Sequence, residues 1–257
     1  MAGFQQVDIG RTLTFEQAAA YQASIVGPHI SKQKFIDFSF EGTSTLYGWS
    51  STTANGMTLA QGAVDGGSMT LTLGGVDEDC GELVHTAQWS PAYNCGMFAK
   101  LKISAITEVC VTVGFVDAKE NTNDHVAGEI DSAALRNMST TADWAGFTFD
   151  TDQTTKVWYV GASKNGTEGT PVAAVGSLAP VANTYFYVCV QTDSDGNVLF
   201  YYGTQIDRMT SVKRLYAATG AIAKTTSDLF APYIGFLAHT ATALVCTVSR
   251  VIVWQDN

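Results

Sequence analysis

The segment HVAGEIDSAALRNM, residues 125–138, holds the two carboxylates whose spacing best suits catalysis. Glu129 and Asp131 are two positions apart, and side chains two apart on a β-strand project from the same face. Both carboxylates could therefore share one groove. A retaining glycosidase needs two carboxyl groups that flank the bond it cleaves, so the question is whether this strand supplies a complete set.

The segment resembles the catalytic strand of the laminarinase-type, concanavalin A-like glucanases, which carries Glu-x-Asp-x-x-Glu or a version one residue longer. In that family the first glutamate is the nucleophile, the aspartate tunes it and the last glutamate is the acid. The resemblance covers Glu129 to Asp131 and then stops, because Ala133 and Ala134 stand where the second glutamate should come and Leu135 follows. We therefore expect no catalytic residues and no enzymatic activity, with a β-glucanase-like glycosidase as the less favoured alternative.

Three acidic segments could bind calcium through clustered oxygens: VDEDCGE at 76–82, FDTD at 149–152 and TDSDGNVLFYYG at 192–203. The last is no EF-hand, because counting from Asp193 the glycine comes fourth and Thr204 comes twelfth, where a glutamate is required. Asp195-Gly196 between strand-like flanks instead predicts a two-residue hairpin turn. Short acidic loops are usually only solvated, so we expect no metal and no cofactor.

The histidines and cysteines show no metal-binding pattern. None of the four histidines has HxH or HExxH spacing, so a metal cluster would need tertiary proximity. They are His29, His85, His125 and His239. Five cysteines without a CxxC pair argue against a zinc site and against a complete disulfide framework. Cys110, Cys189 and Cys246 lie in strand-like runs and should be small buried hydrophobic residues.

Charge limits the partners. The formal net charge is −10, with a pI near 4.7 and no cluster of Lys and Arg, so direct binding to nucleic acid is not expected. Proteins, neutral sugars and cations remain. Much of the basic charge away from the chain ends lies in RMTSVKRLYAATGAI, residues 208–222. This segment could be a helix or a long loop. Arg208, Lys213 and Arg214 there belong to a solvated connection or to a contact patch for an acidic partner.

The N-terminal residues 1–34 differ from the rest. MAGFQQVDIGRTL has no basic n-region and no apolar h-region, and no stretch of the chain approaches eighteen apolar residues, so we expect assembly in a cytosol-like compartment and no membrane partner. Thr14 and Gln17 resemble a capping box, followed by FEQAAAYQASIV and a stop at Gly27-Pro28. These features predict an arm with one short helix that is ordered by docking on its own domain or on a neighbour.

From Phe35 to the end, strand-like segments alternate with turns, and the sequence predicts one domain over residues 35–257. Eleven segments have period-2 or continuous apolar character: 34–42, 68–75, 81–89, 97–106, 108–117, 145–152, 156–163, 184–193, 197–203, 232–240 and 243–255. No helix is expected between them, which excludes a βαβ arrangement. The prediction is an all-β, two-sheet antiparallel jelly-roll sandwich with an N-terminal arm containing a short helix.

The large aromatic residues could form a platform on which sugars stack, but in a sandwich such residues are usually buried in the core. The candidates for either role are Trp49, Trp89, Trp144, Trp158 and Tyr93. The sequence does not name ligand-binding residues, and a surface glycan stays an alternative partner.

From residue 35 onward the chain resembles a concanavalin A-like jelly roll, and TTADWAGFTFDTD, residues 140–152, is similar in style to structural proteins of tailed bacteriophages. The resemblance implies a non-enzymatic virion protein, such as a capsid decoration or cement protein. It would form a homo-oligomer, bind the major capsid protein or other virion proteins through arm and sandwich, and be assembled in the host cytoplasm. A lectin-like carbohydrate-binding module is the alternative function.

Overall fold

The structure is a computed structural model, which describes residues 34–40, 48–54, 57–62, 67–119, 125–131, 134–135, 141, 143–174, 178–205, 209–215 and 229–256. Apart from Lys34, the predicted arm lies outside these ranges, so its helix and the domain boundary at residue 34 stay predictions. Within the described ranges, no helix has the length and apolar character needed to cross a membrane.

The described residues form strands almost throughout, because apolar and β-branched residues alternate between short turns. In chain order the strands are β1 (Lys34–Phe38), β2 (Trp49–Ala54), β3 (Thr58–Gly62), β4 (Ser68–Thr72), β5 (Cys80–His85), β6 (Gly96–Ile103), β7 (Val109–Val116), β8 (Ile130–Asp131), β9 (Ala134–Leu135), β10 (Trp144–Asp150), β11 (Trp158–Lys164), β12 (Thr167–Glu168), β13 (Val172–Ala173), β14 (Phe186–Thr192), β15 (Val198–Gly203), β16 (Thr210–Leu215), β17 (Ala231–Ala238) and β18 (Val245–Gln255). One short 3-10 helix, η2 (Pro91–Tyr93), precedes β6.

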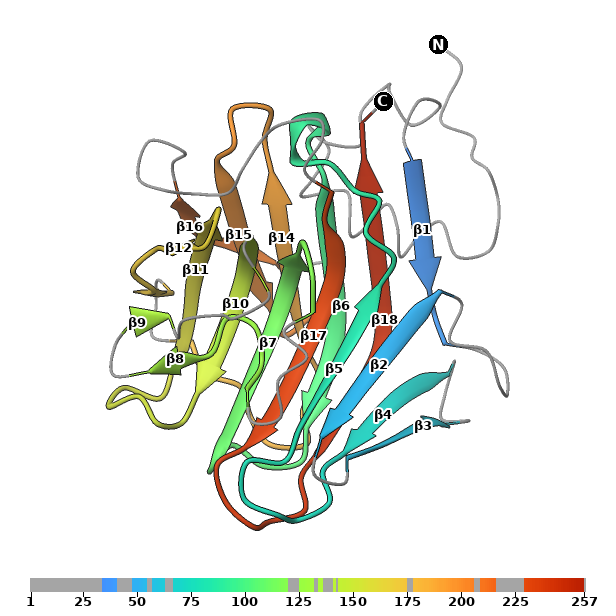
Figure 1. The fold of residues 1–257 in the computed structure, drawn as a ribbon, viewed down its shortest axis with the longest axis vertical. Coiled ribbons are helices and arrows are strands. Elements are labelled where there is room, and N and C mark those ends of the chain that lie inside the picture. Colours follow the sequence, from blue (N-terminus) through green and yellow to red (C-terminus); the bar gives the residue numbers. More distant parts are fainter. Residues whose placement is uncertain are drawn as a thin grey trace.

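Two antiparallel sheets face each other, as predicted (Figure 1). Sheet A has the strand order β16-β15-β14-β6-β18-β4-β3, and β1 also pairs with β18. Sheet B has the order β12-β11-β10-β7-β17-β5-β2, and β13 also pairs with β11. The short strands β8 and β9 pair only with each other in the described part of the chain. The fold is therefore the all-β jelly-roll sandwich that the alternation of the sequence indicates.

All eleven predicted strand segments contain a strand, but one other segment was predicted wrongly. Residues 208–222 were expected to be a helix or a long loop, whereas Thr210–Leu215 form the edge strand β16 and pair with β15. Lys213 and Arg214 lie on this strand, and Arg208 lies outside the described residues. The sequence of this segment is too polar to predict a strand, and its strand conformation is stabilised by backbone pairing with β15.

The hairpin between β14 and β15 is confirmed, although its turn is not the two-residue type. The Asp193 amide donates to the Asn197 carbonyl and the Gly196 amide donates to the Asp193 carbonyl, which leaves a three-residue loop with Gly196 at φ 80°. The Asp193 carboxylate accepts bonds from the amides of Asp195 and Asn197 and from the Arg214 guanidinium. It stabilises the turn rather than offering free oxygens to calcium.

Both faces of sheet B are buried along the strands β5, β7, β10 and β17. The central strand β7 has eight buried residues, and those with odd numbers, 109–115, join the main core between the sheets. On the outer face, Cys110 and Val116 pack in smaller clusters with Val126, Ala127 and Ile130. Residues 125–131, called the crossing segment below, therefore cover the outer face of sheet B.

The predictions for tryptophan and cysteine side chains are confirmed. Trp49, Trp89, Trp144 and Trp158 are buried, and so are all five cysteines. Tyr93, in η2, is 42% exposed. The tryptophans therefore contribute to the core and not to a sugar-stacking surface.

Candidate functional site

At one end of the central strands β10, β7 and β17, sheet B brings two acidic residues beside a histidine. Asp150 is the last residue of β10, and it pairs across the sheet with Cys110 of β7, which in turn pairs with Leu237 of β17. His239 follows β17 directly, and its amide donates to the carbonyl of residue 108. The antiparallel order β10-β7-β17 thus places residues 150 and 239 at the same end of the sheet.

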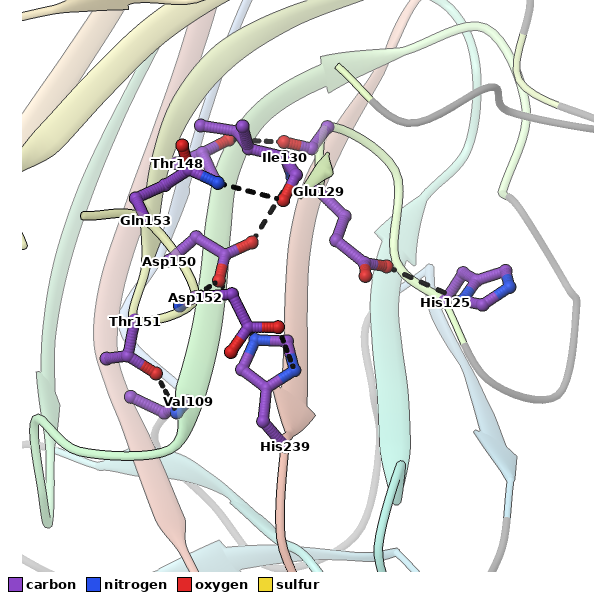
Figure 2. A network of polar contacts seen from close by, with 11 residues as sticks. Val109, His125, Glu129, Ile130, Thr148, Asp150, Thr151, Asp152, Gln153 and His239 are labelled. Atoms are coloured by element: carbon purple, nitrogen blue, oxygen red, sulfur yellow. Dashed lines mark hydrogen bonds and ion pairs between the residues drawn. The ribbon is translucent and has the colours of Figure 1, made fainter. Parts of the chain in front are cut away.

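His239 makes an ion pair with each of two aspartates (Figure 2). Its Nε2 lies 2.9 Å from Asp150 Oδ1, and its Nδ1 lies 3.5 Å from Asp152 Oδ2. The Asp150 side chain is fully buried, whereas that of Asp152 is 60% exposed. Burial opposes the charged imidazole, but the hydrogen bond to Asp150 and the charges of Asp150, Asp152 and Glu129 together outweigh it and raise the pKa of His239.

Asp150 links this cluster to the crossing segment. Its Oδ2 accepts a hydrogen bond from the Ile130 amide at 3.2 Å, and its Oδ1 accepts one from the Asp152 amide at 3.1 Å. Burial raises the pKa of the Cys110 thiol well above its ordinary value, and the Asp150 and Glu129 charges raise it further. The thiol therefore stays protonated and is not a nucleophile.

The crossing segment is fastened to sheet B at several points. The Ala127 amide donates to the Tyr233 hydroxyl at 2.8 Å, and that hydroxyl donates to Glu82 Oε1 at 2.7 Å. Thr148 Oγ1 donates to the carbonyl of residue 128 at 2.6 Å, and Gln153 Nε2 donates to the carbonyl of residue 130 at 3.2 Å. These bonds hold backbone groups of residues 127, 128 and 130 against sheet B, and Figure 2 shows those from Thr148 and Gln153.

The Glu-x-Asp pair does not lie on a strand of either main sheet. Glu129 precedes the two-residue strand β8 in the crossing segment and is only 4% exposed. His125 Nδ1 lies 3.6 Å from Glu129 Oε2. Asp131 is in β8, and its side chain lies outside the described part of the structure. Glu129 is therefore buried among protein groups and does not line an open groove on sheet B.

The acidic segments and the histidines differ in burial and in their neighbours. In VDEDCGE, Asp79 and Glu82 are buried while Asp77 and Glu78 are exposed. FDTD supplies both aspartates of the cluster with His239. His85 is buried against aromatic rings at the other side of sheet B, and His29 lies outside the described residues. Among the described residues, the predicted candidates meet in two places: FDTD lies beside His239, and His125 lies beside Glu129.

The cluster has the composition of a divalent-cation site. One ligand atom each from Asp150, Asp152 and His239 lies within 4.8 Å of the others. Two carboxylates and an imidazole suit Mn²⁺ or Zn²⁺, whereas Ca²⁺ prefers oxygen ligands alone. Sequence reasoning missed this group because residues 150 and 239 are remote in the chain, and the only signal was the acidic end of a strand.

No protein-family model and no curated protein matches the sequence. Solved structures do match in fold. Peanut lectin is 12% identical, with 86% of this chain and 97% of that chain covered and a TM-score of 0.57. A Bacillus licheniformis β-glucanase is 14% identical, with 87% and 99% covered and a TM-score of 0.57.

The exoplasmic/lumenal domain of VIP36, in a form bound to Ca²⁺ and Man3GlcNAc, is 10% identical, with 85% of this chain and 88% of that chain covered and a TM-score of 0.54. At such identities the likeness shows the fold alone. The chain has the sandwich shared by concanavalin A-like lectins and glucanases.

Proposed function

We propose that this protein is a non-enzymatic, lectin-like carbohydrate-binding module that holds a divalent cation at Asp150, Asp152 and His239. The observation that carries the proposal is the convergence of two carboxylates and one imidazole at one end of the central strands of sheet B. Asp150 and His239 form the buried side of this cluster, and Asp152 reaches the solvent. A cation held there would keep an open side, on which sugar hydroxyl oxygens can complete its coordination.

The fold supports this class of function. Among the structures of the same fold are a lectin and a lumenal domain bound to Ca²⁺ and a mannose-containing glycan. The cluster in this chain differs in containing an imidazole, so we expect Mn²⁺ or Zn²⁺ to bind more tightly than Ca²⁺.

Glycoside hydrolysis has less support, although glucanases share the fold. A retaining enzyme places two carboxyl groups about 5 Å apart on either side of the substrate. Glu129 is buried in the crossing segment, and Asp150 is buried with hydrogen bonds on both of its oxygens. Neither group faces a space that a sugar chain could enter, so binding is favoured over cleavage.

The test combines calorimetry with a glycan array. Purified protein is titrated with Mn²⁺, Zn²⁺ and Ca²⁺, and the array is read with and without EDTA. Asp152→Asn should weaken Mn²⁺ or Zn²⁺ binding by at least about tenfold, because a ligand is lost. Asp77→Asn removes an equal charge from an exposed position and should change nothing.

Each part of the proposal can fail separately. No binding of any of the three cations would refute the cation site. An array without a single positive glycan, in the presence of each cation, would refute carbohydrate binding. Cleavage of β-glucan by the wild type, lost in Glu129→Gln, would establish the enzyme instead.

A capsid decoration role remains a hypothesis that the structural likenesses do not favour, and its arm lies outside the described residues. Light scattering before and after removal of residues 1–34 tests it. An oligomer that becomes a monomer would support the arm as an assembly device. A monomer in both forms would oppose a self-assembling lattice protein.

A further inference from the structure

A group of cationic side chains lies on the outer face of sheet A. It is remote from the cluster of Asp150, Asp152 and His239 on sheet B, called the cation cluster below. Lys100 and Lys102 alternate along β6 with the inward-facing residues Leu101 and Ile103. Arg250 of β18 pairs directly with Lys100, so both project from the same face. Both lysines are partly exposed in a protein whose net charge is −10.

Two tyrosines stand beside the lysines. Tyr187 of β14 pairs directly with Lys100 across the sheet, and Tyr185 precedes it by two residues on the same face. The Lys100 ammonium lies 4.5 Å from the centre of the Tyr185 ring and 5.9 Å from that of Tyr187. The Lys102 ammonium lies 5.0 Å from the centre of the Tyr185 ring. Two ammonium groups therefore share one aromatic ring.

Within the described residues, no carboxylate forms an ion pair with either lysine. Arg250 has a bidentate partner, with its Nε and Nη2 at 2.9 and 2.6 Å from the Asp37 oxygens. For Lys100 and Lys102, by contrast, the described residues provide ring contacts and no ion pair. Burial lowers the pKa of Lys100, and the charge of Arg250 lowers it further. An anionic ligand at this surface would therefore meet two lysines without a described carboxylate partner and, beside them, an arginine that is already paired with Asp37.

We propose that this Lys–Tyr surface, made of Lys100, Lys102, Tyr185 and Tyr187 with Arg250 at its border, binds a polysaccharide that carries carboxylate or sulfate groups. The lysines supply charge-assisted hydrogen bonds to the anionic groups. The tyrosine rings and hydroxyls supply flat, amphipathic contacts suited to sugar rings. This surface is separate from the cation cluster, so it does not depend on the function proposed above.

The charge density of the polymer decides between ligand classes. Duplex DNA carries one negative charge per about 1.7 Å and would be repelled by the acidic remainder of the protein. A polyuronate carries one charge per sugar, which matches a surface with few cations. An extended chain can follow β6, where the two lysines are about 7 Å apart along the strand.

The experiment measures binding of polygalacturonate, heparin, neutral dextran and duplex DNA to the full-length protein, in EDTA and at 50 mM salt. EDTA removes any contribution of a bound cation, so this result is independent of the cation cluster. We expect polygalacturonate to bind more tightly than heparin, because its charge density matches a surface with few cations, and dextran not to bind. The double variant Lys100→Gln/Lys102→Gln should weaken binding about tenfold or more, because two charge-assisted contacts are lost.

Two further variants distinguish a loss of specific binding from a general effect of charge or of unfolding. Lys164→Gln, on β11 of sheet B, removes one lysine charge away from this surface and should leave polyanion binding unchanged. Asp37→Asn frees Arg250 and should strengthen binding, an increase that a merely unfolded variant cannot produce. Equal loss in the Lys164 control, preference for DNA, or no binding of either acidic polysaccharide would overturn the proposal.

Discussion

Replacing Tyr233 by phenylalanine tests whether the crossing segment is held by specific hydrogen bonds. The Tyr233 hydroxyl is completely buried and connects the Ala127 amide to the Glu82 carboxylate. Burial raises the pKa of Tyr233 well above its ordinary value, and the nearby Glu82 charge raises it further, so the phenol stays protonated and donates. The variant removes one oxygen atom and leaves the ring in place.

The magnitude follows from the two bonds. A hydrogen bond to a charged group contributes about 1.5–3 kcal/mol, and an unsatisfied buried amide costs about 1–3 kcal/mol. Tyr233→Phe should therefore lower the free energy of unfolding by about 3–5 kcal/mol, against a total of about 5–15 kcal/mol for a typical domain. For a domain of this size the melting temperature should fall by about 10 °C.

The matched control is Tyr159→Phe. Its hydroxyl donates to the Thr155 carbonyl at 3.2 Å on the exposed surface, so its loss should change stability by no more than about 0.5 kcal/mol. Urea unfolding gives both values, and hydrogen exchange at the Ala127 amide reports on the segment itself. Equal stability of the two variants, with unchanged exchange at Ala127, would refute the view that Tyr233 fastens the crossing segment.

Three other changes have expected outcomes. The raised pKa of His239 contributes stability that is present below the ordinary pKa of 6.5 and is lost as pH rises through the folded-state pKa. The metal-free wild type should therefore become less stable as pH rises above 6.5, and His239→Gln should lose this dependence in urea titrations. Parallel pH profiles of the two proteins would contradict it. Gly128→Ala should lower the free energy of unfolding by more than about 2 kcal/mol, because φ at this position is +81° and a Cβ would lie 2.3 Å from the Trp144 ring. Chemical denaturation measures this, and a variant as stable as the wild type would contradict it. Burial opposes the charged form of Asp193, but its hydrogen bonds and Arg214 outweigh burial and lower its pKa, so the stability that it contributes should be lost as pH falls below about 4. Asp193→Ala should lower the free energy of unfolding by about 1 kcal/mol at pH 7 and reduce the loss of stability at acid pH. An unchanged dependence on pH below 4 would count against this.

The sheets and their core could be predicted from the sequence, because a period of two in apolar character has one physical meaning when it recurs between turns. Alternation in GMFAKLKI puts Met97 in the core and Lys100 outside, as found. The edge strand β16 could not be predicted in this way. Its sequence TSVKRL has little apolar character, and its conformation depends on the neighbouring strand β15.

The crossing segment shows a second limit. Spacing alone puts Glu129 and Asp131 on one face, but only if they belong to a strand of a sheet. In the structure the chain passes over the outer face of sheet B at this point, and the backbone of residues 127–130 is bonded to side chains from β10, β17 and the turn after β10. No local pattern reports such bonds, because their partners come from other parts of the chain.

By itself the sequence determined the fold class, most strands, the acidic character, and the lack of a second glutamate after Asp131. Only the tertiary structure decided which polar groups meet. Asp150 and His239 are 89 residues apart, and Lys100 and Arg250 are on strands remote in the chain. Antiparallel pairing through an intervening strand joins the first pair, and direct pairing joins the second. Local sequence sets the direction of each side chain, whereas strand order and register set its neighbours.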